Sequence, residues 1–347
     1  MISKAKKTKI KQGTLLWEKV RATRIGGSEV FDIVRYYATD DELWNCGFNA
    51  ENFRDEAPYT TAWALYHKIL NDGMYQREAL APEYAEYGHA VEPYGVYLLN
   101  KCRARKVKAG EVYVTDKLVA SLDVAGVAEE VDIVPFAYGE GTPVTGQRFV
   151  CEQKSMNPVK VKFGVPFKYI VQAQYQIEMT KADFFVLQIM ILKEDTPFIR
   201  GKICQMGRKA RYKYLDENME VRLLYFKSNE HLSRLIKVCL ERFFADVELK
   251  NEPTPFIETD SQRNIIESIR INSAYDPKKE ITLDLSLYSE AKKSEDEASV
   301  ARKAELQRIV EVAKKNNACI FKSPNGTTTA KFSKNGSFLL KEREKAV

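Results

Sequence analysis

The chain of 347 residues lacks the features of membrane and secreted proteins. It has no run of 18 apolar residues, and its basic N-terminus, MISKAKKTKIKQGT, is not followed by the apolar stretch of a signal peptide. We therefore expect a globular cytoplasmic protein that neither enters a membrane nor is secreted. The apolar content of 44% is enough for a sizeable core, in one large α/β domain with an appended piece or in two domains.

Cysteine and histidine are too scattered to form the metal sites in which they usually occur. The six cysteines include no Cys-x-x-Cys pair, which argues against a zinc ribbon or an iron–sulfur cluster. We expect them to be reduced thiols of the core. The three histidines, His67, His89 and His231, are too few and too far apart for a histidine-based site. Any metal chemistry is therefore expected to use carboxylates.

Positive charge is concentrated at the N-terminus. The net charge is +6, but residues 1–24 contain eight Lys and Arg against one Glu, so the remaining chain is close to −1. A basic, poorly ordered arm of this kind, here residues 1–14, binds nucleic-acid phosphates by releasing counterions. A solvated tail without a partner has the same composition, and the sequence leaves both interpretations open.

The stretch from Gln147 to Thr180 contains the strongest indication of chemistry. Its first part, RFVCEQK, has the composition of a buried strand, yet Glu152 and Lys154 lie two residues apart and so face the same side. The carboxylate can bind a divalent cation, while the lysine polarises or deprotonates a nearby water. The alternative is an ion pair at a solvated strand end.

A second candidate site lies near the N-terminus. Residues 14–34 predict a short helix with Trp17 as an aromatic anchor, a break at Gly26-Gly27, and a helix that begins at Glu29 with Ser28 as its cap. Free backbone N–H groups there, with the Ser28 hydroxyl and the Arg21 guanidinium, would form an anion pocket suited to a phosphate. An ordinary Gly-Gly turn with a serine cap is the alternative.

A carboxylate also occurs on the apolar stripe of a predicted helix. The helix starts at Pro82, and its stripe includes Tyr87, Val91 and Leu98. Glu92 falls on this stripe directly before Pro93, where we expect a kink. An inward-facing carboxylate needs a partner or a cation, which makes Glu92 a candidate ligand, although a surface position fits the sequence as well.

The order of predicted elements indicates an α/β layer with helices over a mixed sheet. Strands are predicted from Glu111 onward, and Asp123 closes the second of them. A helix over 167–180 carries Gln172, Gln174 and Gln176, and the following ADFFVLQIMIL is apolar enough for a central strand.

The C-terminal third predicts more helix and two hairpins. Residues 229–249 form an amphipathic helix expected to cover the sheet, and residues 289–317 a second helix. Residues 319–341 read as hairpins with turns at Asn325-Gly326 and Asn335-Gly336. The predicted organisation is a basic arm (1–14), a main domain (15–255) and a C-terminal helix and β-hairpin extension (256–347).

Five short blocks within about residues 15 to 195 together resemble one nuclease family. They are Trp17…Arg21…Ile25-Gly26-Gly27-Ser28, Gly88…Glu92-Pro93, Ser121-Leu122-Asp123, Glu152-Gln153-Lys154 and Tyr169…Gln172-x-Gln174. The succession resembles the YqaJ family of viral recombinases, relatives of the phage lambda-type exonuclease in the PD-(D/E)XK nuclease superfamily. The resemblance implies a restriction-endonuclease-like core, in which helices flank a central mixed β-sheet.

The resemblance implies a metal site. Asp123 and Glu152 would be the main ligands of one or two Mg²⁺ ions, for which Mn²⁺ would substitute, with help from the Gln153 backbone carbonyl and the Glu92 carboxylate. Hard cations held by carboxylates stabilise the charge that develops in phosphodiester hydrolysis. Three further acidic residues are alternative ligands, namely Glu129, Glu130 and Asp132.

The resemblance also implies roles for residues that do not bind metal. Lys154 would orient or activate the attacking water, with its pKa lowered by the cations and by burial. Gln172 would position Lys154 or that water. Arg21 and Ser28 would hold the 5′-phosphate of a DNA end, and Arg77 is a further candidate for that contact.

The function implied is a Mg²⁺-dependent exonuclease that digests double-stranded DNA ends from 5′ to 3′, in phage-type recombination or DNA repair. Its partners would be DNA ends, a single-strand annealing protein and further copies of the chain in a ring. It would act in the host bacterial cytoplasm if it is phage-encoded. The alternatives are a structure-specific or restriction-type endonuclease of the same fold, and a non-catalytic DNA-binding or assembly protein.

Overall fold

The computed structural model describes residues 2, 5–70, 82–101, 104–128, 146–157, 164–256, 265, 279–286, 298–316, 318–324, 328–332 and 338–342. Several predictions lie outside these residues, namely Arg77, the alternative ligands Glu129, Glu130 and Asp132, and the turns at Asn325-Gly326 and Asn335-Gly336. The chain divides into two compact units, residues 1–59 with 65–250 (unit 1) and residues 60–64 with 251–347 (unit 2). Within the described ranges, no helix has both the length and the apolar character needed to cross a membrane.

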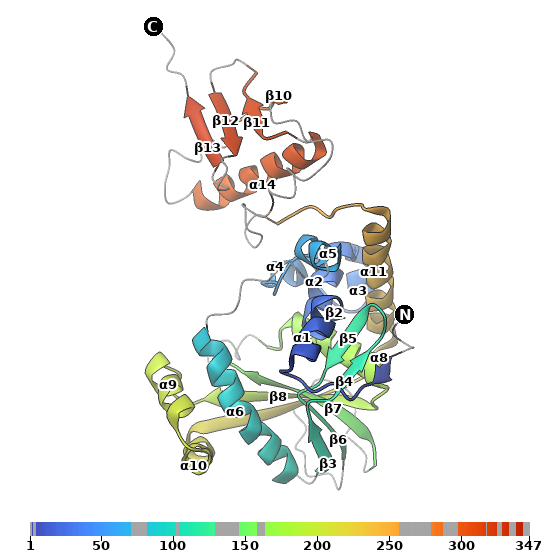
Figure 1. The fold of residues 1–347 in the computed structure, drawn as a ribbon, viewed down its shortest axis with the longest axis vertical. Helices are drawn as coiled ribbons and strands as arrows, with labels where there is room; N and C mark the ends of the chain where they lie inside the picture. Colours follow the sequence, from blue (N-terminus) through green and yellow to red (C-terminus); the bar gives the residue numbers. More distant parts are fainter. Residues whose placement is uncertain are drawn as a thin grey trace. The chain divides into compact units, whose positions relative to one another are not determined.

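Unit 1 is built on a mixed five-stranded sheet with the order β3-β6-β7-β8-β9 (Figure 1). Its strands are β3 (Ala104–Ala109), β6 (Val124–Ala128), β7 (Arg148–Ser155), β8 (Phe184–Leu192) and β9 (Met219–Lys227). Strands β7 and β8 are parallel, and the other neighbours are antiparallel. Every residue of β8 is buried, because helices cover both faces of the sheet and β7 and β9 flank this strand. The predicted central position of this apolar strand is confirmed.

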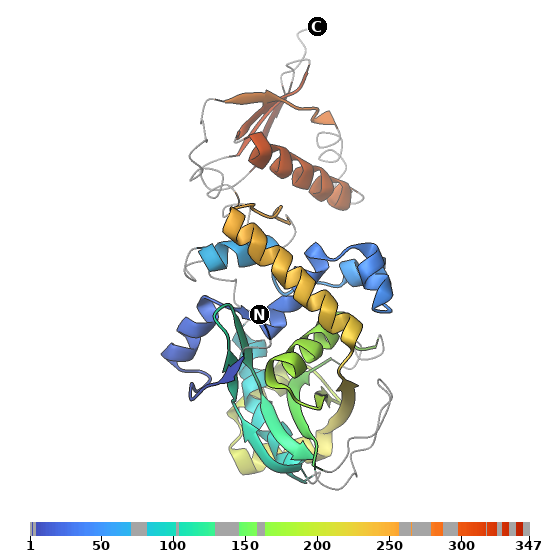
Figure 2. The same cartoon turned by 90° about the vertical axis from the view of Figure 1, so that its right-hand side faces the viewer.

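Helices cover both faces of this sheet, which gives the mixed α/β fold that the sequence predicted. On one face lies α6 (Pro82–Lys101), with α9 (Pro197–Gln205) and α10 (Arg208–Asn218) beside it (Figure 1). On the other face lies α8 (Phe167–Thr180), against which α2 (Gly27–Tyr37) and α11 (Glu230–Leu249) pack (Figure 2). Successive residues of β7 therefore face different helices: Cys151 packs on the α6 side and Val150 on the α8 side.

A second sheet leads into the first. It has the order β1-β4-β5-β2 and consists of β1 (Lys6–Lys7), β4 (Val112–Val114), β5 (Leu118–Ser121) and β2 (Ile25–Gly26). The basic arm differs from the poorly ordered segment expected from its composition. Lys6 and Lys7 pair with β4, and Gln12 Nε2 donates to the Leu122 carbonyl at 2.8 Å. The backbone groups along the β4 edge offer partners that composition does not reveal.

The first two helices begin where polar side chains satisfy their N–H groups. Helix α1 (Leu15–Ala22) has Thr14 as its N-cap. Helix α2 begins at Gly27, two residues earlier than predicted, and its N-cap is Gly26. The Glu29 carboxylate accepts from the Gly26 amide at 2.7 Å and pairs with Lys68 Nζ at 2.7 and 2.8 Å. Glu29 thus supplies the cap that was expected of Ser28, which lies in the first turn.

Other elements confirm or correct the predicted ones. Helix α6 continues through Pro93, where we expected a kink. Helix α5 (Ala62–Leu70) follows Thr61, whose Oγ1 accepts from the Ala64 amide at 3.1 Å. Helices α3 (Asp40–Asn45) and α4 (Ala50–Asp55) follow α2. Helix α11 packs mainly on α2 and α8, so its apolar stripe covers helices and not, as predicted, the sheet directly.

Unit 2 is a small α/β unit. Helix α14 (Ala298–Asn316) lies along a sheet of β10 (Glu280–Thr282), β11 (Ile320–Lys322), β12 (Thr328–Phe332) and β13 (Phe338–Glu342) (Figure 1). Ile309, Phe321 and Ala330 are completely buried in this unit. Strands β11, β12 and β13 are antiparallel neighbours, as the hairpin prediction requires, and β10 pairs with β11 in parallel.

Tyr175 joins α8 to the second sheet, and removal of its hydroxyl should destabilise unit 1. The Tyr175 hydroxyl lies 3.3 Å from the Ile25 carbonyl and 3.1 Å from the Val119 carbonyl, and all three residues are buried. We expect Tyr175→Phe to lower the free energy of unfolding by about 1–2 kcal/mol, because buried acceptors lose a donor. Urea denaturation measures the change. Tyr36→Phe, at a residue that is 44% exposed, is the control and should change stability by less than about 0.5 kcal/mol. Equal losses in both variants would contradict the assignment.

Candidate functional site

Two predicted ligands meet where the two sheets of unit 1 join. Asp123 lies between β5 and β6, and β6 pairs with β7 so that Val124 faces Cys151. This register places Asp123 beside the end of β7 that carries Glu152. The Asp123 Oδ2 accepts a hydrogen bond of 2.8 Å from the Gln153 amide. The backbone of β7 therefore holds the Asp123 carboxylate in place.

Glu152 and Lys154 face α8, as the period of a strand predicts. Lys154 Nζ donates to Glu152 Oε1 at 2.6 Å, and Gln176 Nε2 of α8 donates to Glu152 Oε2 at 3.0 Å. Glu152 is 7% exposed, so these two donors take the place of water around its carboxylate. Buried carboxylates with such partners are expensive to maintain, which makes a purely structural ion pair a poor explanation.

The charges of the site act strongly on one another. Burial and the neighbouring Glu152 carboxylate raise the pKa of Asp123 to about 8, and Glu92 adds a smaller effect in the same direction. Burial lowers the pKa of Lys154, but Glu152, Tyr59 and Asp123 outweigh it and raise that pKa above its ordinary value. With the groups of the chain alone, the direction for Lys154 is opposite to the one predicted. Lys154 is thus held as an ammonium group.

Two tyrosines lie near Lys154, and neither was among the predicted site residues. Lys154 Nζ lies 5.4 Å from the centre of the Tyr169 ring, close enough for a cation–π interaction. Tyr59 is hydrogen-bonded to Tyr169, and burial raises the pKa of its phenol against the opposing charge of Lys154. The sequence signal for Tyr169 is its spacing of three from Gln172, whereas Tyr59 comes from a distant segment.

The segment that carries Tyr59 is fixed by carboxylates at two points. The Glu56 carboxylate accepts from the first amides of α8, Phe167 at 2.6 Å and Lys168 at 3.1 Å. The Asp32 carboxylate of α2 accepts from the Tyr59 amide at 3.2 Å. A carboxylate at a helix N-terminus satisfies orphan N–H groups and complements the helix dipole. Residues 56–59 are therefore held against both α8 and α2.

Gln172 lies at the predicted place on α8, but its side-chain oxygen forms no hydrogen bond with Lys154 or Glu152. It is 4% exposed on α8, one turn after Tyr169 and one turn before Gln176. Its Oε1 is buried and accepts no hydrogen bond within the described part of the chain. An orphaned buried acceptor of this kind suits a water molecule or a substrate donor. Gln176 makes the contact with Glu152, a role that its spacing of four from Gln172 would have indicated.

Glu92 lies at the edge of the site. Its side chain is 45% exposed and its Oε2 is 3.6 Å from His89 Nδ1, so it is not the inward carboxylate suspected from the apolar stripe. The link from α6 to β7 is made by Gln153 instead. With its amide oriented to suit both neighbours, this side chain lies 3.1 Å from the Glu92 carbonyl oxygen and 3.0 Å from the Val96 amide.

The two residues of the predicted phosphate pocket, Arg21 and Ser28, lie on α1 and α2. Trp17 Nε1 of α1 donates to Ser121 Oγ at 2.9 Å, two residues before Asp123, and the Arg21 guanidinium lies 4.7 Å from the centre of the Trp17 ring. Arg21 is thus held on the edge that leads to Asp123. Ser28 lies in the first turn of α2, where Gly27 packs against Gln172 and Tyr175.

The donor set suits magnesium better than a closed metal cage. Among the described residues, no group of three or more His, Cys, Asp or Glu side chains could hold a metal ion. Asp123 and Glu152 form a pair of acidic side chains, the Lys154 ammonium group lies beside Glu152, and Gln172 Oε1 adds an unsatisfied oxygen. Mg²⁺ typically uses one or two carboxylates and keeps several waters. The residues present fit that mode of binding, with Glu92 as an outer neighbour.

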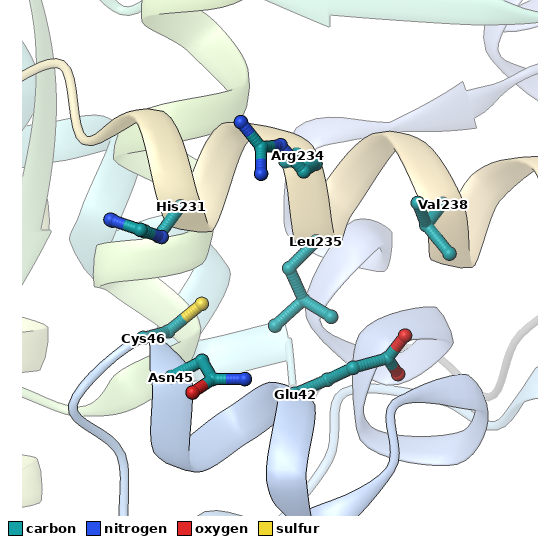
Figure 3. A pocket seen from close by; sticks show the side chains of 7 residues that line it. All are labelled: Glu42, Asn45, Cys46, His231, Arg234, Leu235 and Val238. Atoms are coloured by element: carbon teal, nitrogen blue, oxygen red, sulfur yellow. The ribbon is translucent and has the colours of Figure 1, made fainter.

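A cavity elsewhere in unit 1 has no such chemistry. It has a volume of about 360 Å³ and lies between the end of α3 and the start of α11, where Figure 3 shows Cys46 and His231 on facing elements. Its one carboxylate, Glu42, forms two hydrogen bonds of 2.7 Å with Arg242. Burial raises the pKa of the Cys46 thiol, which disfavours a reactive thiolate. The candidate site therefore remains at Asp123 and Glu152.

The close approach of α6 to β7 should depend on Gly95. A Cβ at this position would lie 2.4 Å from Gln153 Nε2 and 2.9 Å from Gln188 Oε1. We expect Gly95→Ala to lower the free energy of unfolding by about 1–3 kcal/mol, because the helix or both glutamines must shift. Gly88→Ala, on the same helix with nothing within 4 Å of its Cβ, should instead raise it by about 0.5–1 kcal/mol. Urea denaturation of both variants checks the opposite signs, and a stabilising Gly95→Ala would refute the contact.

Comparison of the sequence with protein-family models and with curated proteins finds no match. Among solved structures, the chain is similar to LHK-Exo, an alkaline exonuclease from Laribacter hongkongensis, at 15% identity and a TM-score of 0.42, over 68% of this chain and 94% of that chain. It is also similar to a phage related exonuclease from Haemophilus somnus 129PT, at 9% identity and a TM-score of 0.39, over 65% of this chain and 96% of that chain. These likenesses concern the fold alone, and the site is assigned from the contacts described above.

Proposed function

We propose that this chain is a metal-dependent DNA exonuclease that acts on double-stranded ends from 5′ to 3′. The observation that supports the proposal most directly is the arrangement of Asp123, Glu152 and Lys154. Two acidic side chains, one from the turn between β5 and β6 and one from β7, meet at the junction of the sheets, with an ammonium group 2.6 Å from one of them. An ordinary protein core gains nothing from this arrangement, whereas phosphodiester hydrolysis needs each of its parts.

The carboxylates would bind the cation, and their second contacts would orient them. Mg²⁺, or Mn²⁺ in its place, would supply positive charge to the phosphodiester and make a bound water more acidic. Asp123 is oriented by the Gln153 amide, and Glu152 by Gln176. Both carboxylates are thereby held in fixed positions before any ion binds, which lowers the reorganisation needed for binding.

Lys154 would act as a charged donor and not as the base. Its pKa is raised by Glu152 and Asp123, against the effect of burial, so it carries a proton at neutral pH. An ammonium group at this place holds the attacking water or a phosphate oxygen and offsets negative charge as the bond to phosphorus forms. Gln172 Oε1, buried and without a donor, would accept a hydrogen bond from the same water.

The preference for DNA ends would come from α1. Arg21 lies against Trp17, whose indole is bonded to Ser121 beside Asp123. A guanidinium group held beside the segment that leads to Asp123 suits the terminal 5′-phosphate, since arginine forms two parallel hydrogen bonds with a phosphate. Such a contact selects an end over an internal phosphodiester. Digestion from the 5′ end would leave a 3′ single strand for a partner that anneals it.

The nuclease assay uses three substrates with and without Mg²⁺. We expect degradation of a linear duplex with 5′-phosphate ends, slower degradation with 5′-hydroxyl ends, and no cutting of a closed circle. Glu152→Gln and Lys154→Ala should each lower the rate by about 10²–10⁴-fold, because charge stabilisation at the phosphodiester is lost. Lys237→Ala, which removes an exposed lysine elsewhere in unit 1, is the control and should keep full activity.

The outcomes separate the candidate functions. Cutting of the circle would identify an endonuclease. Binding of the duplex without cutting, under all metal conditions, would identify a non-catalytic DNA-binding protein. Retained activity in Lys154→Ala and Glu152→Gln would place the chemistry elsewhere in the chain.

Arg21→Ala should reduce the preference for 5′-phosphate over 5′-hydroxyl ends. A charge-assisted hydrogen bond is worth about 1.5–3 kcal/mol, so the ratio of the two rates should fall by about 10- to 100-fold. The rate on 5′-hydroxyl ends should change little, because that substrate lacks the group that Arg21 holds. Lys19→Ala removes the same charge from an exposed position of α1 and is the matched control. An equal loss on both substrates would argue against an end-specific contact.

A further inference from the structure

The chain contains a strongly basic hairpin that the candidate site does not use. Residues 196–215, which include α9 and α10, contain six Lys and Arg and no Asp or Glu. Acidic residues return only at the two ends, with Asp195 and Asp216. A run of this length with one sign of charge is unusual in a chain that otherwise mixes both signs, and it indicates a polyanionic partner.

Two of the six cations are used within the structure. The Arg211 guanidinium donates to four backbone carbonyls, at Ile203 (3.0 Å), Ala90 (2.9 Å), Cys204 (3.1 Å) and Met206 (2.8 Å). Arg200 Nε lies 3.6 Å from Asp195 Oδ1, and both side chains are largely buried. These contacts fix the turn between α9 and α10 and attach it to α6. The hairpin is therefore a rigid platform.

The other four cations are exposed on this platform. They are Lys202, Arg208, Lys209 and Lys213. None of the four forms an ion pair with any residue in the described ranges of the chain. Lys202 Nζ lies 5.7 Å from the ring centre of Tyr214, and Arg208 Cζ lies 5.4 Å from that of Tyr212. Aromatic rings beside these two cations hold them at the surface without neutralising their charge.

The hairpin is joined to the edge of the candidate site. The Tyr212 hydroxyl donates to the Pro93 carbonyl at 2.8 Å, next to Glu92, and Arg211 reaches Ala90 in the same turn of α6. Figure 1 shows α9 and α10 beside α6, which carries Glu92. A polyanion bound along the exposed cations would thus pass the Glu92 edge of the site. Duplex DNA fits this position because its phosphates continue from the bond that is cut.

We propose that the exposed cations of α9 and α10 bind the phosphate backbone of the duplex whose end is digested. The proposal rests on the proposed nuclease function and adds a duplex-binding surface to it. The contact is electrostatic and independent of sequence. Each phosphate neutralised by Lys or Arg makes log K depend on log[salt] with a slope of about −0.9.

The test measures the salt dependence of DNA binding in the full chain. The Lys154→Ala background prevents digestion, and a blunt 30-base-pair duplex is titrated between 50 and 200 mM salt, on the order of cellular conditions. Adding Arg208→Gln, Lys209→Gln and Lys213→Gln should lower the magnitude of the slope by about 2–3 and weaken binding at the lowest salt about tenfold or more. The control variant adds Lys237→Gln, Lys315→Gln and Lys331→Gln, three exposed lysines elsewhere, and should keep the parental slope.

Failure of this surface and failure of the nuclease function give different results. A triple variant with the parental slope and affinity, together with digestion of DNA by the chain that keeps Lys154, would overturn the surface and leave the function intact. A protein that neither binds nor digests the duplex would overturn both. An equal fall in slope for the control triple would show that only net charge matters, which also overturns the surface. Unchanged thermal unfolding of both triples shows that the fold is preserved.

Discussion

The candidate site of unit 1 is organised around two carboxylates, Asp123 and Glu152, which lie side by side where the two sheets join. Their mutual repulsion is visible in the raised pKa of Asp123, near 8. One ammonium group, from Lys154, offsets part of the negative charge, and a backbone amide and a glutamine side chain satisfy one oxygen of each acid. Buried acids held in this way are costly for stability, and in the proposed function a bound cation would offset that cost.

Helix α8 carries most of the groups that organise the pair. Tyr169, Gln172 and Gln176 share one face because they are separated by three and four residues. Along this face, the Tyr169 ring lies beside Lys154 and Gln176 donates to Glu152. Between them, the Gln172 side-chain oxygen accepts no hydrogen bond from the described residues. On a neighbouring face, the Tyr175 hydroxyl lies within hydrogen-bond distance of the Ile25 and Val119 carbonyls of the second sheet. Strand β5 of that sheet ends two residues before Asp123. Helix α8 thus contacts both Glu152 of β7 and the sheet that precedes Asp123. The Glu56 cap fixes where that helix begins.

The sequence predicted the parts of the site that follow from local periodicity. Glu152 and Lys154 share a face because a strand has a period of two, and the central position of β8 follows from its apolar run. Contacts between distant segments could not be predicted in this way. The bond from Gln153 to Asp123, the arrival of Tyr59 beside Lys154 and the pairing of the basic arm with β4 all depend on tertiary register. Likewise, Glu29 replaced Ser28 as the cap because its longer side chain reaches both Gly26 and Lys68.

Two groups of cations outside the site, Arg21 and the exposed cations of the α9–α10 hairpin, lie at different edges of it. Arg21 is held at the Asp123 edge through Trp17 and Ser121, whereas the α9–α10 hairpin is held at the Glu92 edge through Tyr212 and Pro93. One arginine in a defined position can distinguish a terminal phosphate from an internal one but adds little to the total charge. In the proposed function, the four exposed cations of the hairpin would add most of the salt-dependent affinity without distinguishing one phosphate from another. Selection of an end and retention of the duplex would then be separate tasks, carried by different elements and open to change one at a time.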